Sequence, residues 1–473
     1  MAGPAFSAER PNVLFILTDD QAPWAVGVAG HPLAKTPHMD ALFESGAYLT
    51  HSFTVTPVCS PSRASLMTSR YGTELGITDW IKPYQLWDPE NELGGTEWGL
   101  DPDSLVWPRL LQRSGYETTL IGKWHLGQPN FYHPTKFGFQ RFMGHRHGGW
   151  ATVDPVMEKG KREQGFKGLT ADILADEVIA FLKKKRDKPF LCCWFTRAPH
   201  TRWLPVSEDD AAPYADLTDA ETPIPNPEYP NLDRQRVKQM TREYLSSVRS
   251  VDRNLGRVMK TLEDQGLEDN TIVIYSSDHG YNMGHNGIWH KGNGHWVVNP
   301  LPEPINPNVP RGQRPNMYDT SIMVPTSVRW PGVIAPGTVI DETTINLDWF
   351  PTICAMTGVS IPAEATLRGR DLCPLLKEGA ANDWDNTYYG EYSTLHQSQT
   401  HMRCWRTRSY KLVRDFKNPE RDEFYDLTND PSETTNRINT SEETLQNVIK
   451  QFDGLIRERM SQIGDGITEV ASQ

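Results

Sequence analysis

Two acidic segments of the chain combine carboxylates in a way that indicates a metal site. Asp19 and Asp20 end the apolar stretch NVLFILTDD, and Asp278 with His279 lies near the end of TIVIYSSDHG. If both stretches are strands of one sheet, three carboxylates meet at its edge and repel one another unless a cation neutralises them. Carboxylate oxygens favour Ca²⁺ or Mg²⁺ over zinc, although histidine is an unusual calcium ligand. We therefore expect one hard divalent cation, Ca²⁺ or Mg²⁺, at this place.

Cationic and proton-carrying side chains form a second set of candidates. They are Lys123 and His125 in GKWHLG, His200 in APH, Lys291 in WHKGN, and Arg63 in SPSRAS. Each alone would be an ordinary surface or core residue, but most of them follow predicted strands, which favours one shared pocket. A tetrahedral anionic ester needs a metal on one side, cationic donors on the others and a nucleophile in line with its leaving oxygen. The set therefore predicts chemistry on such an ester.

The segment VCSPSRASLMTSR holds two candidate nucleophiles, Cys59 and Ser60. A free cysteine is usually buried and inert, and its reactivity needs an electropositive, partly exposed setting. The chain has six cysteines, but Cys192 and Cys193 are adjacent in the apolar stretch KPFLCCWF, so a disulfide framework is not expected. Cys59 is then unpaired, and a helix that begins near Ser62 would point its positive end at residue 59.

These residues need a scaffold that brings distant strand ends together. Four stretches are typical of buried parallel strands, because each is a short apolar run with polar residues at its end: NVLFILTDD, ETTLIGKWHLG, KPFLCCWFTRAPH and TIVIYSSDHG. Between them lie two helical stripes: Ile173, Leu174, Val178, Ile179 and Leu182, then Tyr244, Val248, Val251, Leu255, Val258 and Leu262. The pattern predicts an α/β fold with a large mixed, mostly parallel sheet between helices, and a ligand crevice beyond the carboxyl ends of the strands.

The pattern changes after about residue 365. The stretches TYYGEY, HMRCWRTRSYKLVR and DEFYDLTNDP are typical of short strands in hairpins. One face of a following helix is marked by Leu445, Val448, Ile449, Phe452 and Ile456. We therefore expect a catalytic α/β domain in residues 1–365 and a smaller C-terminal α+β subdomain with an antiparallel sheet in residues 366–473.

Composition excludes several classes of protein. The 473 residues carry a net charge of −12, which argues against nucleic acid as a partner, since phosphate binding needs a concentrated basic face. A local basic cluster can still bind a small anion. The longest apolar runs are far shorter than the ~18 residues of a membrane span. The start MAGPAFSAERPN lacks a hydrophobic signal core, so we expect a periplasmic or secreted protein whose signal peptide is absent here, with the cytoplasm as the alternative.

The segment from Cys59 to Arg63, CSPSR, matches in full the Cys-x-Pro-x-Arg motif of the type I sulfatase family. The chain resembles this family of the alkaline-phosphatase-like superfamily over nearly its whole length. The other matching blocks are PNVLFILTDDQ, TPHMDALFESGAYLTHSFTVTP, LIGKWHLG, SDHG, RWPG, YKLVRD and FYDLTNDPSETTN. Because these blocks occur in order and at family-like spacing, the chain is identified as a member.

The resemblance implies how Cys59 takes part in the chemistry. In the family this cysteine is oxidised after translation to Cα-formylglycine, so a formylglycine-generating or anaerobic maturation enzyme is an implied partner. The hydrated aldehyde provides a gem-diol, one oxygen of which attacks sulfur and gives a calcium-assisted sulfated-enzyme intermediate. Ser60 is then only the variable second position of the motif.

The resemblance also implies roles for the other candidates. The implied metal ligands are Asp19, Asp20, Asp278, His279 and the modified residue 59. The implied catalytic residues are residue 59, Arg63, which holds the diol, and Lys123, His125, His200 and Lys291. Lys123, Lys291 and His200 bind the sulfate oxygens, and His200 or Lys291 protonates the leaving oxygen. His125 then takes a proton so that sulfate is expelled.

The expected substrate is a sulfate ester within a sulfated poly- or oligosaccharide. Flat aromatic rings beside polar groups suit sugar faces, and several tryptophans fall in loop-like stretches: Trp80, Trp87, Trp98, Trp150, Trp203 and Trp296. The candidate substrate-binding residues are His147, Arg202, Trp203 and Trp296. Packing in the core is the other interpretation of such tryptophans.

Two alternatives fit the same residues. The first is an arylsulfatase or a phosphonate or phosphate ester hydrolase of the same superfamily, which rates on matched esters would separate. The second is a protein that binds sulfated glycans without turnover, although the retention of every implied catalytic position argues against it.

Overall fold

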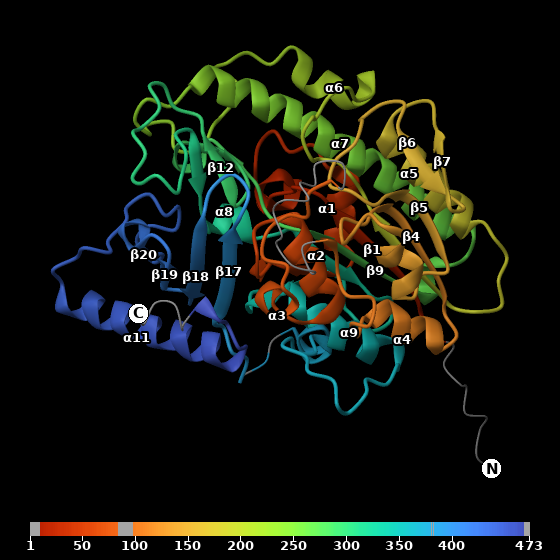
Figure 1. The fold of residues 1–473 in the computed structure, drawn as a ribbon. Helices are drawn as coiled ribbons and strands as arrows, with labels where there is room; N and C mark the ends of the chain where they lie inside the picture. The colour runs from red at the N-terminus through yellow and green to blue at the C-terminus, as the bar shows by residue number, and fades with distance from the viewer. Residues whose placement is uncertain (1–9, 84–97, 380, 382, 468–473) are drawn as a thin grey trace.

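The computed structural model describes residues 10–83, 98–379, 381 and 383–467. Its centre is a mixed sheet, of which Figure 1 labels β1, β4, β5, β6, β7 and β9. The sheet has ten strands in the order β15-β2-β14-β9-β1-β8-β4-β5-β6-β7. In this order the strands are Thr338–Ile340, Ala47–Leu49, Thr326–Arg329, Thr271–Ser277, Asn12–Thr18, Phe190–Phe195, Glu117–Lys123, Arg141–His145, Val156–Lys159 and Arg162–Gly165. The strands from β9 to β5 run parallel to one another, and antiparallel pairs flank them on both sides.

Alternate residues of β1 belong to two different cores, one on each face of the sheet. Phe15 and Leu17 pack in the first cluster, whereas Leu14 and Ile16 pack in the second, as the period of a strand requires. The first core includes residues of α2 (Cys59–Thr68), α4 (Trp107–Arg113), α9 (Trp349–Thr357) and α10 (Cys373–Glu378). The second includes residues of α1 (Pro37–Glu44), α5 (Thr170–Leu182) and α7 (Arg234–Asp264). The predicted sheet between helices is confirmed.

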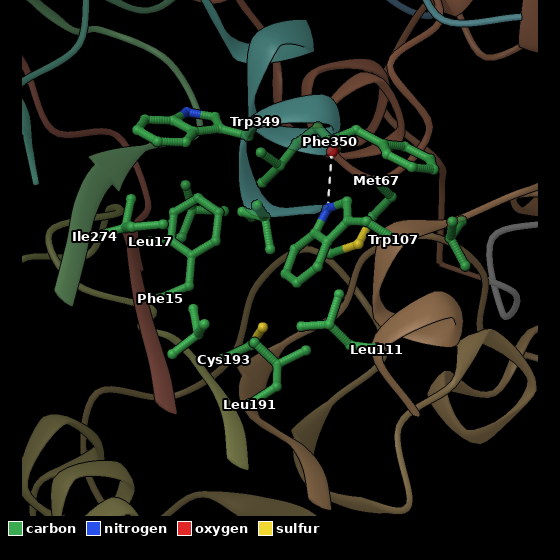
Figure 2. Packing of buried hydrophobic residues seen from close by; sticks show 14 of the residues in the cluster. Phe15, Leu17, Met67, Trp107, Leu111, Leu191, Cys193, Ile274, Trp349 and Phe350 are labelled. Carbon is green, nitrogen blue, oxygen red and sulfur yellow. Dashed lines mark hydrogen bonds between the residues drawn. The ribbon is translucent and has the colours of Figure 1, made fainter. Parts of the chain in front are cut away.

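Trp107 anchors the first core (Figure 2). Its ring centroid lies 6.0 Å from that of Phe15, whose own ring is 5.7 Å from Trp349. The indole nitrogen of Trp107 donates a hydrogen bond of 3.1 Å to the carbonyl oxygen of Leu66 in α2. Because buried polar groups need such partners, this bond fixes how α4 lies against α2, the helix that begins with Cys59.

All four predicted parallel strands are present, as β1, β4, β8 and β9. Their register aligns the carboxyl ends: Thr18 pairs with Ser277, and Phe195 pairs with both Leu17 and Gly122. The residues that follow these positions therefore meet at one edge of the sheet, where open α/β sheets bind ligands.

A four-stranded antiparallel sheet lies next to this edge. Its strands are β10 (Asn282–Met283), β11 (Ile288–His290), β12 (Asn293–Trp296) and β13 (Gln313–Pro315). Lys291 and Gly292 link β11 to β12, and the Gly292 amide donates to the carbonyl oxygen of Pro57 at 3.0 Å. This bond holds the Lys291 turn against the segment that precedes Cys59.

Two short strands, β3 (Ser52–Phe53) and β16 (Thr344–Ile345), pair separately. Short helices form at α3 (Gly72–Leu75), α6 (Glu208–Ala215) and α8 (Asp319–Ile322).

The predicted C-terminal antiparallel sheet and helix are also confirmed. The sheet consists of β17 (Tyr388–Thr394), β18 (Thr400–Arg406), β19 (Tyr410–Asp415) and β20 (Glu423–Asp426). Helix α11 (Glu443–Gln462) runs along it in Figure 1 and packs Phe452 and Ile456 into the same core as Leu412. Buried ion pairs tie the sheet to α8, since Asp319 accepts from both Arg406 and Lys411 at 2.7 and 2.9 Å. The domain division at residue 365 stays a prediction.

Each of the six cysteines is buried and free. Of the helices in the described part of the chain, none combines the length and the apolar character that crossing a bilayer requires.

Candidate active site

Asp19, Asp20, Asp278 and His279 lie together at the carboxyl edge of the main sheet, with their side chains buried. The parallel pairing of β1 with β9 causes this, since Asp19 directly follows β1 and Asp278 directly follows β9. The Nε2 atom of His279 lies 3.2 Å from Asp20 Oδ1 and 3.3 Å from Asp278 Oδ1. Burial and the nearby Asp19 carboxylate raise the pKa of Asp278 to about 6. Gathering these acids is therefore electrostatically unfavourable without a counter-charge.

The hydrogen bonding of His279 indicates that a cation fits among these acids. Its Nδ1 lies 3.0 Å from the Gly280 carbonyl oxygen and donates to it, so Nε2 presents a lone pair to two carboxylates unless it is protonated. Asp20 Oδ2 is buried and has no hydrogen-bond partner among the described residues. Donor atoms of four residues lie within 4.8 Å of one another: Asp19, Cys59, Asp278 and His279. The site therefore fits a metal ion bound mainly by carboxylate oxygens.

Cys59 is the first residue of α2, where backbone N–H groups still lack partners within the helix. The sequence predicts a start near Ser62, but the Ser62 amide already donates to the carbonyl oxygen of Val58 at 3.2 Å. The helix can begin earlier because proline is tolerated in a first turn. Cys59 Sγ then lies 3.3 Å from His279 Nε2 and 3.6 Å from Asp19 Oδ1.

The thiol of Cys59 has a setting unlike that of the other cysteines. Burial alone would raise its pKa, but Lys123 and Lys291 lower it to about 5. Burial instead raises the pKa of Cys354 and of Cys404 to about 12 each. Reactive cysteines are found in electropositive surroundings of the first kind, so Cys59 is chemically distinct within this chain.

A buried cation pairs with each of the three acids. Lys123 Nζ lies 2.6 Å from Asp19 Oδ2, Lys291 Nζ lies 2.7 Å from Asp20 Oδ1, and Arg63 Nε lies 2.9 Å from Asp278 Oδ2. Lys291 Nζ also donates to Cys59 Sγ at 3.0 Å. Apart from residue 59 and the histidines, the three carboxylates and three cations balance, so a divalent cation would add positive charge to the site. Such a surplus attracts an anionic ester.

A cavity of about 390 Å³ borders Cys59, and its wall includes Trp80, His125, His147, His200 and Lys291. This volume is within the ~300–1,000 Å³ typical of ligand sites. His125 Nε2 lies 3.1 Å from the carbonyl oxygen of Ile81 and donates to it. Its Nδ1 therefore carries the lone pair, and this atom is buried without a hydrogen-bond partner among the described residues. Burial lowers the pKa of His125, so the ring is neutral and can accept a proton.

Arg197 holds the loop that carries His200, although the sequence did not single it out. Its guanidinium donates to the carbonyl oxygens of Trp150, His200, Thr201 and Arg202 at distances of 2.7 to 2.9 Å. His200 Nδ1 lies 2.6 Å from the Thr201 carbonyl oxygen and donates to it, and His200 Nε2 lies 4.0 Å from Asp20 Oδ2. The only sequence signal was the nearness of Arg197 to His200 in TRAPH, which does not show that the side chain turns inward.

Because Gly148 has no Cβ atom, it leaves the space that the His125 ring occupies in the cavity wall. A Cβ atom at Gly148 would lie 2.6 Å from His125 Cε1 and 2.7 Å from Nε2, so alanine must displace the ring and its bond to Ile81. Because a shift of about 1 Å can cost about 10²-fold in rate, we expect Gly148→Ala to lower kcat by about 10- to 100-fold. Steady-state ester hydrolysis measures this.

Gly149→Ala is the matched control for this prediction. Its Cβ atom would be 3.9 Å from the nearest side-chain atom, His200 Cε1, an ordinary contact distance. It should therefore lose much less activity, and both variants should melt close to the wild-type temperature. Equal losses of kcat in the two variants would refute the positioning role of Gly148.

The candidate substrate-binding residues lie in different places. His147 lines the cavity beside Cys59, whereas Arg202 and Trp296 do not. Trp203 is only 6 % exposed, because it packs in the core against Tyr244 and Tyr281. Of the other tryptophans singled out, Trp80 lines the cavity, Trp150 stacks on His145 at 4.0 Å, and Trp87 is outside the described residues. Loop position in the sequence was therefore a poor guide to which rings meet the cavity.

The fold and the site fit a hydrolase of anionic esters, with Cys59 among buried carboxylates and cations. Residues 11–359 match the Sulfatase family, and residues 313–462 match the family described as N-sulphoglucosamine sulphohydrolase, C-terminal. The chain therefore belongs to the type I sulfatase family of the alkaline-phosphatase-like superfamily, and it is a sulfuric ester hydrolase.

Similar proteins extend over nearly the whole chain. The N-acetylglucosamine-6-O-sulfatase of Bacteroides thetaiotaomicron is 25% identical, with 97% of this chain and 87% of that protein covered. The ulvan-active sulfatase of Formosa agariphila is 28% identical, with 96% and 82% covered.

Two solved structures show the shared fold. One, in complex with its substrate D-glucosamine-2-N,6-O-disulfate, has a TM-score of 0.79 and 24% identity, covering 97% of this chain and 99% of that one. The phosphonate monoester hydrolase of Agrobacterium radiobacter has a TM-score of 0.72 and 21% identity, with 96% of each chain covered.

Proposed function

We propose that this protein hydrolyses sulfate esters on a sulfated poly- or oligosaccharide. The observation that carries the proposal is the meeting of Cys59 with three carboxylates and Lys291 beside a ligand-sized cavity. A sugar substrate is supported by a relative named for N-acetylglucosamine 6-O-sulfate and by a similar structure that holds a sulfated glucosamine.

Ca²⁺ is part of the proposal, held by residue 59 and the four residues Asp19, Asp20, Asp278 and His279. Bound there, the ion supplies positive charge to one side of the sulfate group. Arg63 keeps this arrangement in place, because its Nε pairs with Asp278 while its Nη1 donates to the Lys123 carbonyl oxygen at 3.0 Å. One guanidinium thus joins the end of β9 to the end of β4.

Oxidation of Cys59 to Cα-formylglycine by a formylglycine-generating or anaerobic maturation enzyme is also part of the proposal. The hydrated aldehyde supplies the oxygen nucleophile. Around it, Lys123, Lys291 and His200 bind and orient the sulfate oxygens. His200 or Lys291 donates the proton to the leaving oxygen, and His125 accepts a proton at Nδ1, the ring nitrogen that lacks a partner.

The fold likeness to a phosphonate monoester hydrolase favours one alternative, a phosphonate or phosphate ester hydrolase of the same superfamily. An arylsulfatase would use the same residues on a smaller substrate. A sulfated-glycan binding protein is the non-enzymatic alternative, and it would require neither a proton acceptor at His125 nor a nucleophile at residue 59.

A panel of esters tests these possibilities together. Sulfate release is measured from N-acetylglucosamine 6-sulfate, other sulfated monosaccharides, sulfated oligosaccharides and an aryl sulfate, and phosphate or phosphonate release from matched aryl esters. We expect the highest kcat/KM on a sulfated sugar, because sugar contacts made in the transition state lower the barrier. Much faster hydrolysis of the aryl sulfate or the phosphonate would overturn the choice of substrate, and binding without release would support the non-enzymatic alternative.

Two broader expectations belong to the proposal. We place catalysis in residues 1–365 and the C-terminal subdomain in residues 366–473. We place the protein in the periplasm or outside the cell, with the cytoplasm as the alternative.

A further inference from the structure

A second cavity of about 390 Å³ adjoins the one at Cys59, and His147 lines both. The second cavity is walled by residues of three segments, among them Pro129, His145, Arg146, Glu158 and Glu163. His147 is fixed between the two cavities, because its Nε2 lies 3.2 Å from Nδ1 of His145, which in turn stacks on Trp150. His147 therefore lies between two cavities that are each large enough to hold a group of ligand size.

The charge of the second cavity differs from that of the first. Arg146 is its only cation among the described lining residues, and Arg146 Nε pairs with Glu158 Oε2 at 3.1 Å. Glu163 forms no ion pair within the described part of the chain and is exposed. It stands directly opposite Glu158 in the pairing of β6 with β7. The wall thus keeps one uncompensated negative charge, whereas the described wall at Cys59 contains Lys291 and no carboxylate.

We infer that the cavity beyond His147 is a subsite for the sugar next to the sulfated one, and that it takes an uncharged residue. This inference rests on the proposed sulfatase activity toward sugars. Arg146 and the Nε2 atom of His145, which has no hydrogen-bond partner among the described residues, can hydrogen-bond hydroxyl groups, as sugar sites require. A sulfate or carboxylate on the same residue would instead face Glu163, and like charges in contact disfavour binding.

The test compares two disaccharides of the monosaccharide sulfate on which the panel above finds the highest kcat/KM. In both, that residue is linked to galactose, which is either unmodified or 6-O-sulfated. Wild-type protein should have a kcat/KM about tenfold higher for the neutral disaccharide than for the monosaccharide, the effect of roughly one net hydrogen bond. The sulfate on galactose should lower kcat/KM by about two- to fivefold, as expected for a charge pair near the surface.

Glu163→Gln separates charge repulsion from simple crowding. It should bring the ratio of kcat/KM for the two disaccharides close to one, and in wild-type protein 0.5 M salt should shrink the same ratio by screening. Glu443→Gln, an exposed glutamate of α11, is the control and should leave the ratio at its wild-type value.

The outcomes distinguish the subsite from the activity on which it rests. Equal kcat/KM for the monosaccharide and the neutral disaccharide would overturn the subsite while leaving the sulfatase activity intact. A penalty for the second sulfate that persists in Glu163→Gln would overturn the charge selectivity. If no sulfated sugar is hydrolysed at all, the proposed function itself fails.

Discussion

Replacing Cys59 by alanine should lower kcat on every sulfate ester by at least about 10⁴-fold, as the loss of a nucleophile does in other hydrolases. The side chain lies 3.3 Å from His279 Nε2 and 3.0 Å from Lys291 Nζ, so the substitution removes the group at the centre of the proposed site. Alanine leaves neither a nucleophile nor a precursor of the aldehyde. Sulfate release at saturating substrate measures the effect.

Cys404→Ala is the matched control, because Cys404 is also buried and free but lies in β18 of the C-terminal sheet. It should lower the melting temperature through lost packing and leave kcat within a few-fold of wild type. Mass spectrometry of the tryptic peptide that contains residue 59 should show the aldehyde in active preparations and the thiol in inactive ones. Activity of Cys59→Ala close to that of Cys404→Ala would remove residue 59 from the mechanism.

The convergence of Asp19 and Asp278 could be predicted because it depends on strand ends. NVLFILT and TIVIYSS are short, mainly apolar runs, and every residue of β1 and β9 is buried, because both faces of these strands are covered. Parallel strands place their following residues at one edge, so the acids had to meet if the two strands are neighbours. The same reasoning placed Lys123 at the end of β4 and His200 in the loop after β8.

The residues that sequence reasoning missed lie in irregular segments, where no periodicity shows which side chain turns inward. Arg197 donates to backbone carbonyl oxygens such as that of His200, and Gly148 allows the His125 ring to approach closely. Residue type alone does not reveal either role. Trp203 was expected to meet a sugar, yet it fills a gap between α7 and the strand ends beside Tyr244 and Tyr281. A tryptophan in a loop has as much apolar surface as one in a helix, so it is often buried in the core.

The second large effect is expected at the metal site, where Asp278→Asn should abolish metal binding and activity together. The change removes a carboxylate donor and turns the balanced set of three acids and three cations into one with a net positive charge, which repels a divalent ion. Losing the several kcal/mol that a metal contributes to the transition state should cost at least about 10³-fold in kcat. Inductively coupled plasma mass spectrometry of the dialysed protein should find one divalent cation per wild-type chain and none in the variant.

Asp465→Asn distinguishes loss of the metal from loss of a buried ion pair. Asp278 and Asp465 both accept from an arginine Nε through Oδ2, Arg63 at 2.9 Å and Arg403 at 2.7 Å, and both pairs are buried. Breaking either pair costs up to about 3–5 kcal/mol of stability, but only the first borders the metal donors. Added Ca²⁺ should therefore raise the melting temperature of wild type and of Asp465→Asn, since a ligand at 100 times its Kd stabilises by about 2.7 kcal/mol. Added Ca²⁺ should leave the melting temperature of Asp278→Asn unchanged. If Ca²⁺ stabilises Asp278→Asn as much as Asp465→Asn, the cation is bound somewhere other than between β1 and β9.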